Sequence, residues 1–279
     1  IPSHVKTVPW GPYVPLLPES TPSTGAHFVH RFARLTIPAP CVSNRAICNA
    51  IPTGFGPRAA AGNLSDGGAT MPGIGFHTDA FNARCWDFDK SLAWARDHGV
   101  EFIECGAIGG VNYMHGLGFS PHIALWEDPI LLRRKMEGYG VRFSQIDAAF
   151  PVSRPEGETI GVQYILESIR YANLVGCPCI DTTDAATKPE GLSERETLDL
   201  VKRIYARLIP VAEAHGIIVN MEPHGYVTTN PEFVAEILDA FPSENFRINM
   251  DTGNTFIAGQ DPVAYLNQFK ERISHVHIK

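Results

Sequence analysis

The sequence has no long run of apolar residues, few cysteines, and fewer basic than acidic side chains. Hydrophobic residues make up 44% of its 279 positions, yet no run approaches the roughly 18 apolar residues that a membrane-spanning helix needs. Its six cysteines form no C-x-x-C pair, and a chain this long needs no disulfide bonds to hold a core together. The 23 basic and 30 acidic residues argue against a nucleic-acid-binding surface, which requires clustered Lys and Arg. We therefore expect a soluble, cytoplasmic protein that binds neither membranes nor nucleic acids.

The chain consists of two segments that differ in composition. Residues 1–70 hold ten prolines, seven glycines, five basic and only two acidic residues, which leaves 18 basic and 28 acidic residues for the rest of the chain. The first segment also shows no sustained hydrophobic period of 2 or 3.6. We expect residues 1–70 to be an irregular, Pro/Gly-rich extension outside the folded domain, and residues 71–279 to be that domain.

From residue 71 onward, short β-branched runs alternate with longer amphipathic stretches, which is typical of βα units in a parallel sheet. Ser193 is a predicted helix N-cap, Asn230-Pro231 and Asp261-Pro262 place a proline in the first turn of a helix, and a glycine closes several helices. The expected strands are 74–81, 100–108, 141–150, 178–185, 217–224, 246–254 and 273–279; the expected helices are 87–98, 131–139, 163–175, 194–215, 231–240 and 262–272. Seven strands are one fewer than a closed barrel requires, so we expect an α/β fold: a (β/α)8 TIM barrel truncated after strand 7.

Polar residues gather at the ends of the expected strands, where barrel enzymes place their active sites. Side chains two positions apart share a strand face, and the last three strands end in such polar pairs: Asn220 with Glu222, Asn249 with Asp251, and His275 with His277. Burying each of them without a partner costs about 1–3 kcal/mol. Their convergence therefore indicates a ligand. Earlier strands add further polar residues, namely His77, Glu104, Gln145, Asp147, Asp181 and Thr183.

Glu222, Asp251 and His277 together form a mixed oxygen and nitrogen donor set for a divalent metal ion. Such donors favour Mn2+, Mg2+ or Co2+, and Zn2+ is also compatible. We expect His224, which follows Glu222 closely, to contact the substrate. The remaining candidate substrate contacts each have a structural alternative, such as holding a loop or forming a turn; they are His77, Glu104, Asp147, Asp181 and His275.

Three of these segments resemble the xylose isomerase-like TIM barrels, and more narrowly the sugar phosphate isomerase/epimerase group with its D-tagatose 3-epimerases and inosose-type enzymes. They are VNMEPHG (219–225), INMDTGN (248–254) and SHVHIK (274–279). The resemblance implies a divalent ion held by a Glu, an Asp, a His and a second Glu on strands 5 to 8. The first three match Glu222, Asp251 and His277, whereas the fourth has no counterpart before the chain ends. Asn254 stands where relatives often carry a His that contacts the substrate.

The resemblance implies a sugar isomerase or epimerase that removes a proton next to a ketose carbonyl and passes through an enediolate, with Glu222 as the base. Its partner would be a small-molecule sugar or keto-sugar, and a homo-oligomer is compatible with the sequence. Two alternatives remain open: a metal-dependent 3-keto-glycoside lyase that uses the same site for β-elimination, and a truncated barrel without activity. An endonuclease IV-like nuclease is disfavoured, because residues 71–279 carry a net charge of −10.

Overall fold

The computed structural model describes residues 73–84, 86–109 and 121–279, so the expected extension over residues 1–70 lies outside the described residues. Seven parallel strands follow one another across a single sheet in the order β1, β2, β4, β5, β6, β7 and β8. Their bounds are Gly75–His77, Phe102–Ile108, Arg142–Asp147, Cys179–Thr182, Ile218–Met221, Phe246–Asp251 and Ile273–His277. A short strand, β3 (His122–Ala124), pairs with the second half of β2. This sequential parallel order is that of a TIM barrel.

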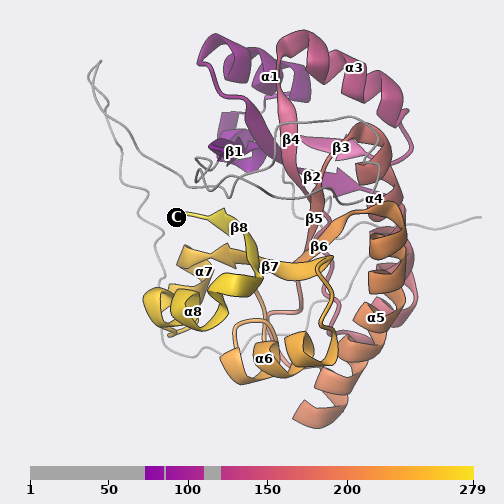
Figure 1. The fold of residues 1–279 in the computed structure, drawn as a ribbon, viewed down its shortest axis with the longest axis vertical. Helices are drawn as coiled ribbons and strands as arrows, with labels where there is room; N and C mark the ends of the chain where they lie inside the picture. Colours follow the sequence, from indigo (N-terminus) through magenta and orange to yellow (C-terminus); the bar gives the residue numbers. More distant parts are fainter. Residues whose placement is uncertain (1–72, 85, 110–120) are drawn as a thin grey trace, which may run out of the picture. The chain divides into compact units, whose positions relative to one another are not determined.

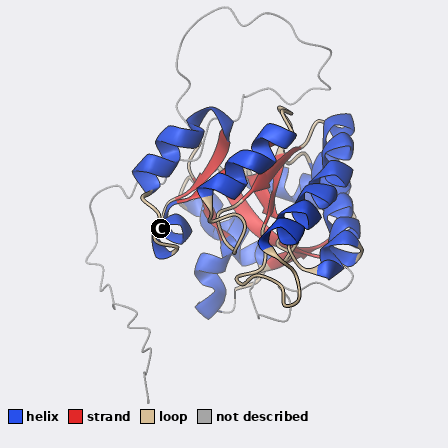
Figure 2. Ribbon diagram, turned by 90° about the horizontal axis from the view of Figure 1, so that it is seen from below, coloured by secondary structure: helices blue, strands red, loops and turns tan. Residues whose placement is uncertain are grey.

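Helices connect the strands and lie outside them (Figures 1 and 2). The α-helices are α1 (Phe88–Asp97), α3 (Pro129–Tyr139), α4 (Ile160–Val175), α5 (Glu194–His215), α6 (Pro231–Ala240), α7 (Thr252–Ile257) and α8 (Pro262–Phe269); short 3-10 helices are η1 (Thr78–Arg84), η2 (Pro155–Glu158) and η3 (Lys270–Arg272). The buried face of α5 packs Leu198, Val201 and Leu208 into the core. Among the helices that the structure describes, none is both long and apolar enough to cross a membrane.

The sheet curves strongly, as contacts between its distant strands demonstrate. β2 and β8 are five strand spacings apart along the sheet, a separation of about 24 Å if the sheet were flat. Nevertheless, Oε2 of Glu104 on β2 and Nε2 of His277 on β8 lie 2.6 Å apart. Side chains alone cannot bridge such a span, so the strands must wrap around a shared interior. Curvature therefore brings residues from strands on opposite sides of the sheet into one site.

Two register shifts align the polar residues on this interior. Between β2 and β4 the pairing moves from Ile103 with Phe143 to Glu104 with Gln145, so Ser144 is an extra residue. Between β7 and β8 it moves from Ile248 with Ile273 to Asn249 with His275, so Ser274 is extra. Such bulges commonly re-aim side chains beside functional sites. Here they place polar residues of neighbouring strands side by side.

The predicted strands and helices are all present, but six of the seven strands end two to four residues earlier than expected. The local cause is visible for two of them. The segment 74–81 is a strand only over Gly75–His77 and then turns into η1, whose Thr78 and Asp79 favour turns. The segment 246–254 ends as a strand at Asp251, whose side chain caps α7. Elsewhere the predicted N-cap of α5 is present as a full capping box between Ser193 and Glu196.

Candidate metal centre

Three side chains from consecutive strands meet at the carboxyl edge of the sheet. Asp251 ends β7, His277 ends β8, and Glu222 directly follows β6. The Nδ1 atom of His277 lies 3.3 Å from Oε1 of Glu222 and 3.6 Å from Oδ2 of Asp251. Ligand atoms bound to one divalent ion at about 2.0–2.2 Å are themselves roughly 3–4 Å apart. The spacing of this trio therefore fits a single ion.

Asp251 divides its two oxygens between the fold and the site. Its Oδ1 accepts a hydrogen bond of 2.7 Å from the backbone N–H of Asn254, which caps α7. Its Oδ2 is paired with Nζ of Lys279 at 2.6 Å, although the side chain of Asp251 is fully buried. Burial raises the pKa of Asp251, but the contacts with His277, Asn254 and Lys279 hold it well below its usual value. An ionised carboxylate oxygen that already contacts a cation is well suited to bind a metal ion.

Glu222 is fixed both through its backbone and through its side chain. Its N–H donates a hydrogen bond of 3.0 Å to the carbonyl of Thr182 on β5. Its Oε1 accepts a hydrogen bond of 3.3 Å from the side-chain amide of Asn254. Asn254 occupies the first turn of α7, so this helix orients both carboxylates of the trio.

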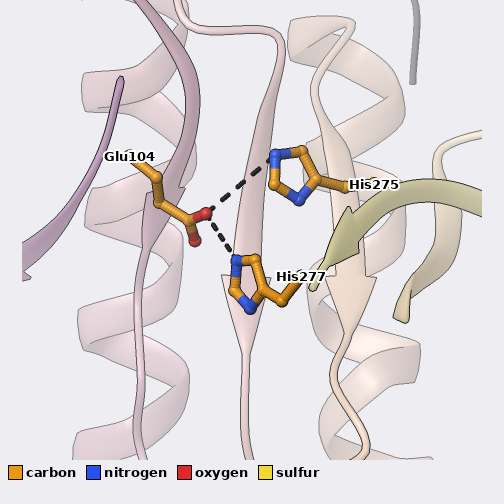
Figure 3. A group of neighbouring side chains, drawn as sticks. All are labelled: Glu104, His275 and His277. Carbon is orange, nitrogen blue, oxygen red and sulfur yellow. Dashed lines mark hydrogen bonds and ion pairs between the residues drawn. The ribbon is translucent and has the colours of Figure 1, made fainter. Parts of the chain in front are cut away.

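Glu104 contacts the other side of the His277 ring (Figure 3). Its Oε2 lies 2.6 Å from Nε2 of His277 and 4.0 Å from Nε2 of His275. Burial lowers the pKa of His277, but the charge of Glu104 and the contacts with Asp251 and Glu222 raise it well above its usual value. For His275 burial dominates and lowers the pKa to about 4, so this ring is neutral. Without a bound ion, a protonated His277 provides positive charge among the carboxylates.

A second acidic group surrounds His77 at the end of β1. Its Nδ1 lies 2.8 Å from Oδ1 of Asp79, and its Nε2 lies 3.7 Å from Oδ2 of Asp147. The rings of His77 and His277 are 6.2 Å apart between their centres. His77 and Asp147 therefore border the trio, as expected of residues that contact a bound substrate.

Several buried polar atoms in this region have no hydrogen-bond partner within the part of the chain that the structure describes. Among them are Oδ1 of Asp147, Oδ1 of Asp181 and Nε2 of His275. The other oxygen of Asp181 accepts a hydrogen bond of 3.2 Å from Asn249. Burial and the neighbouring carboxylates of Glu222 and Glu104 raise the pKa of Asp181 well above its usual value. Unpaired buried acceptors at one edge of a barrel indicate that a ligand or ordered water completes the site.

The structure brings nearly all the predicted site residues to this edge of the sheet. His224 is the exception, because its side chain is exposed. Its backbone N–H donates a hydrogen bond to the hydroxyl of Thr228. Two charged residues at the site were not anticipated, Lys279 beside Asp251 and Asp79 beside His77. Both lie two positions beyond a predicted site residue, so the same alternation that selected His277 and His77 could have found them.

Residues 92–279 match the family described as the xylose isomerase-like TIM barrel. The chain belongs to this family. No protein of curated function matches the chain in sequence. The similarity to solved xylose isomerase-like structures lies in the fold, because the sequence identities are low.

Three solved structures illustrate this similarity. An L-ribulose 3-epimerase is 17% identical with a TM-score of 0.59, over 74% of this chain and 69% of that chain. The IOLI protein, whose crystal structure contains a bound zinc atom, is 16% identical with a TM-score of 0.59, over 73% and 71%. A probable 3-DHS dehydratase, AsbF from Bacillus anthracis, is 21% identical with a TM-score of 0.55, over 74% and 72%.

Proposed function

We propose that the protein is a sugar isomerase or epimerase that depends on a divalent metal ion and removes a proton next to a ketose carbonyl. The observation that carries this proposal is the convergence of Glu222, Asp251 and His277, with donor atoms 3.3 and 3.6 Å apart. The zinc in the similar IOLI structure and the name of the similar L-ribulose epimerase support it. Carboxylate-rich donors favour Mn2+, Mg2+ or Co2+ and also accept Zn2+.

The charge balance of the site favours a divalent cation. Four buried carboxylates lie at this edge of the sheet, from Glu104, Asp147, Glu222 and Asp251, beside the buried carboxyl group of Asp181, whose pKa is raised. Facing them among the described residues are His77, His277 and Lys279. Burying excess negative charge is costly unless it is paired or bound to a metal. A bound divalent ion would polarise the substrate carbonyl and stabilise negative charge on its oxygen.

Glu222 is the proposed catalytic base. Its carboxylate is buried and is oriented by the Asn254 amide and by the His277 ring. In this role it takes the proton from the carbon next to the carbonyl and holds it at a carboxylate oxygen. His77, Asp147 and the unpaired oxygen of Asp181 are proposed to bind the hydroxyl groups of the sugar.

Proton exchange in D2O tests this proposal directly. The full chain is stripped with EDTA, reloaded with Mn2+, Co2+, Mg2+ or Zn2+, and incubated with L-ribulose or D-fructose while NMR follows the C–H signals next to the carbonyl. We expect metal-dependent loss of one C–H signal, which Glu222→Gln abolishes. Glu232→Gln, on the exposed first turn of α6, is the matched control and should exchange normally. Normal exchange in Glu222→Gln would remove this residue from the mechanism.

A lyase is the second candidate, because the similar AsbF structure is described as a probable dehydratase. Removal of the same proton would then be followed by loss of a β-substituent instead of return of the proton. The neutral Asn254 beside Glu222 is compatible with either outcome. Incubation with a 3-keto-glycoside distinguishes them: release of the aglycone, without exchange on free ketoses, would favour the lyase over the isomerase.

A further inference from the structure

We propose that Glu104 is a positioning residue, which holds His277 by one ring nitrogen and thereby turns the other toward Glu222 and Asp251. The inference rests on the metal site proposed above. Glu104 comes from β2 and His277 from β8, and their 2.6 Å contact joins Oε2 to Nε2 (Figure 3). The Nδ1 atom of the same ring faces the two candidate ligands at 3.3 and 3.6 Å.

The two nitrogens of His277 therefore have separate functions. A neutral imidazole carries one proton and one lone pair, and the hydrogen bond at one nitrogen decides where each resides. An ionised carboxylate can only accept, so Glu104 keeps the proton on Nε2 and leaves the lone pair on Nδ1. Metal-binding histidines generally have such an outer partner, which fixes the ring and increases its basicity.

Glu104 is itself held in place by a chain of buried hydrogen bonds. Its Oε1 accepts from Nε2 of Gln145 at 2.9 Å, and Oε1 of Gln145 accepts from Nδ2 of Asn220 at 2.6 Å. Oδ1 of Asn220 then accepts from the hydroxyl of Ser274 at 2.6 Å. Every donor and acceptor in this chain is consistent with an ionised Glu104. The carboxylate thus has one oxygen fixed by the interior and one fixed on His277.

A competing reading is a second ion held by Glu104, His275 and His277, whose donor atoms also lie within 4.8 Å of one another. The 2.6 Å separation of Glu104 and His277 argues against it. Two ligands of one ion lie roughly 3–4 Å apart, whereas 2.6 Å is the length of a strong hydrogen bond. An ion here together with one at Nδ1 would also require the ring to lose both of its protons. The contact is therefore a positioning hydrogen bond.

Metal affinity measured by calorimetry on the full, EDTA-stripped chain tests the proposal with Mn2+ as the probe. We expect one Mn2+ per chain in the wild type. Glu104→Leu should weaken binding about 10–100-fold, and Glu104→Gln should weaken it less, because its carbonyl still accepts one hydrogen bond. Glu232→Gln also removes a carboxylate charge, but Glu232 lies exposed on the first turn of α6 and outside the site, so this variant should leave the affinity within about threefold. Asp251→Asn should abolish measurable binding.

A second readout reports the ring itself and does not depend on affinity. With Zn2+ as a diamagnetic ion, 15N NMR of the histidines should show His277 with a proton on Nε2, and Glu104→Leu should perturb that signal. If both Glu104 variants bind Mn2+ with wild-type affinity while Asp251→Asn does not, the positioning role is refuted and the metal site stands. Two ions per chain, falling to one in Glu104→Leu, would refute it in favour of a second site. If Asp251→Asn binds normally, the metal site itself is wrong.

Discussion

Asp184 should be a major determinant of stability, because one buried carboxylate organises the loop that follows Glu222. Its Oδ2 accepts a hydrogen bond of 2.7 Å from the backbone N–H of Val227, and its Oδ1 accepts one of 2.5 Å from the hydroxyl of Thr228. The Thr228 oxygen in turn accepts from the N–H groups of His224 and Gly225. Asp184 therefore holds this loop together through its side chain.

The size of this loss of stability follows from the hydrogen-bonding groups that lose their partner when the Asp184 side chain is truncated. Asp184→Ala leaves the Val227 N–H and the Thr228 hydroxyl without their acceptor, at about 1–3 kcal/mol for each buried group. Burial raises the pKa of Asp184 in spite of its hydrogen bonds, because burying an ionised carboxylate is unfavourable. The variant no longer carries this cost. Part of the loss is thereby offset. We expect the free energy of unfolding to fall by about 2–4 kcal/mol.

Urea unfolding followed by circular dichroism measures this loss. Asp199→Ala serves as the control, because Asp199 forms an exposed pair with Arg195 within α5 that is worth at most about 0.5 kcal/mol. Hydrogen exchange at the Val227 amide separates local from global effects, since this amide should lose its protection in Asp184→Ala before the core opens. A loss below about 1 kcal/mol, or equal to that of the control, would refute the reasoning.

Two further predictions concern pH and metal. Burial lowers the pKa of His77, but Asp147 and Asp79 raise it to about 10. The contribution of His77 to the unfolding free energy should therefore be largest below pH 6.5 and should fall as the pH rises toward 10. His77→Asn should flatten this dependence on pH. An unchanged dependence in the variant would contradict the prediction. Mn2+ at about 100 times its Kd should stabilise the EDTA-stripped chain by about 2.7 kcal/mol, or roughly 5–11 °C in Tm. Asp251→Asn should lose most of this shift in a thermal melt, and an equal shift would count against the site.

The elements that sequence predicted best are those with strong local signals. The bounds of α5 and α6 agree with the predicted 194–215 and 231–240, because their caps are fixed by neighbours in sequence. β3 and α7 were missed, since three and six residues are too few to display a period. The ends of all the predicted strands except β2 were extended too far, because a strand ends where its pairing partner ends, which local composition does not report.

The site could be predicted in its chemistry but not in its contacts. Alternation selected Asp251 and His277, and the family resemblance added their role as ligands. The contact between Glu104 and His277 joins residues 173 positions apart and depends on the curvature of the sheet. Nor could alternation tell which acids support loops: Asp184 holds a loop, whereas Asp181, three residues earlier, keeps a buried oxygen without a partner in the described chain.

Register is the step at which sequence reasoning could most easily have failed. In-register neighbours of a parallel sheet point to the same face, and a slip of one residue moves a whole strand to the opposite face. Had the pairing of Ile248 with Ile273 continued unbroken, Asp251 would lie beside Val276 and both histidines of β8 would face away from it. The extra residue Ser274 restores the alignment, and its hydroxyl donates a hydrogen bond to Asn220 on β6. The inward side of β8 was thus identified by the polarity of its residues, because only one face of that strand could complete a site with Asp251.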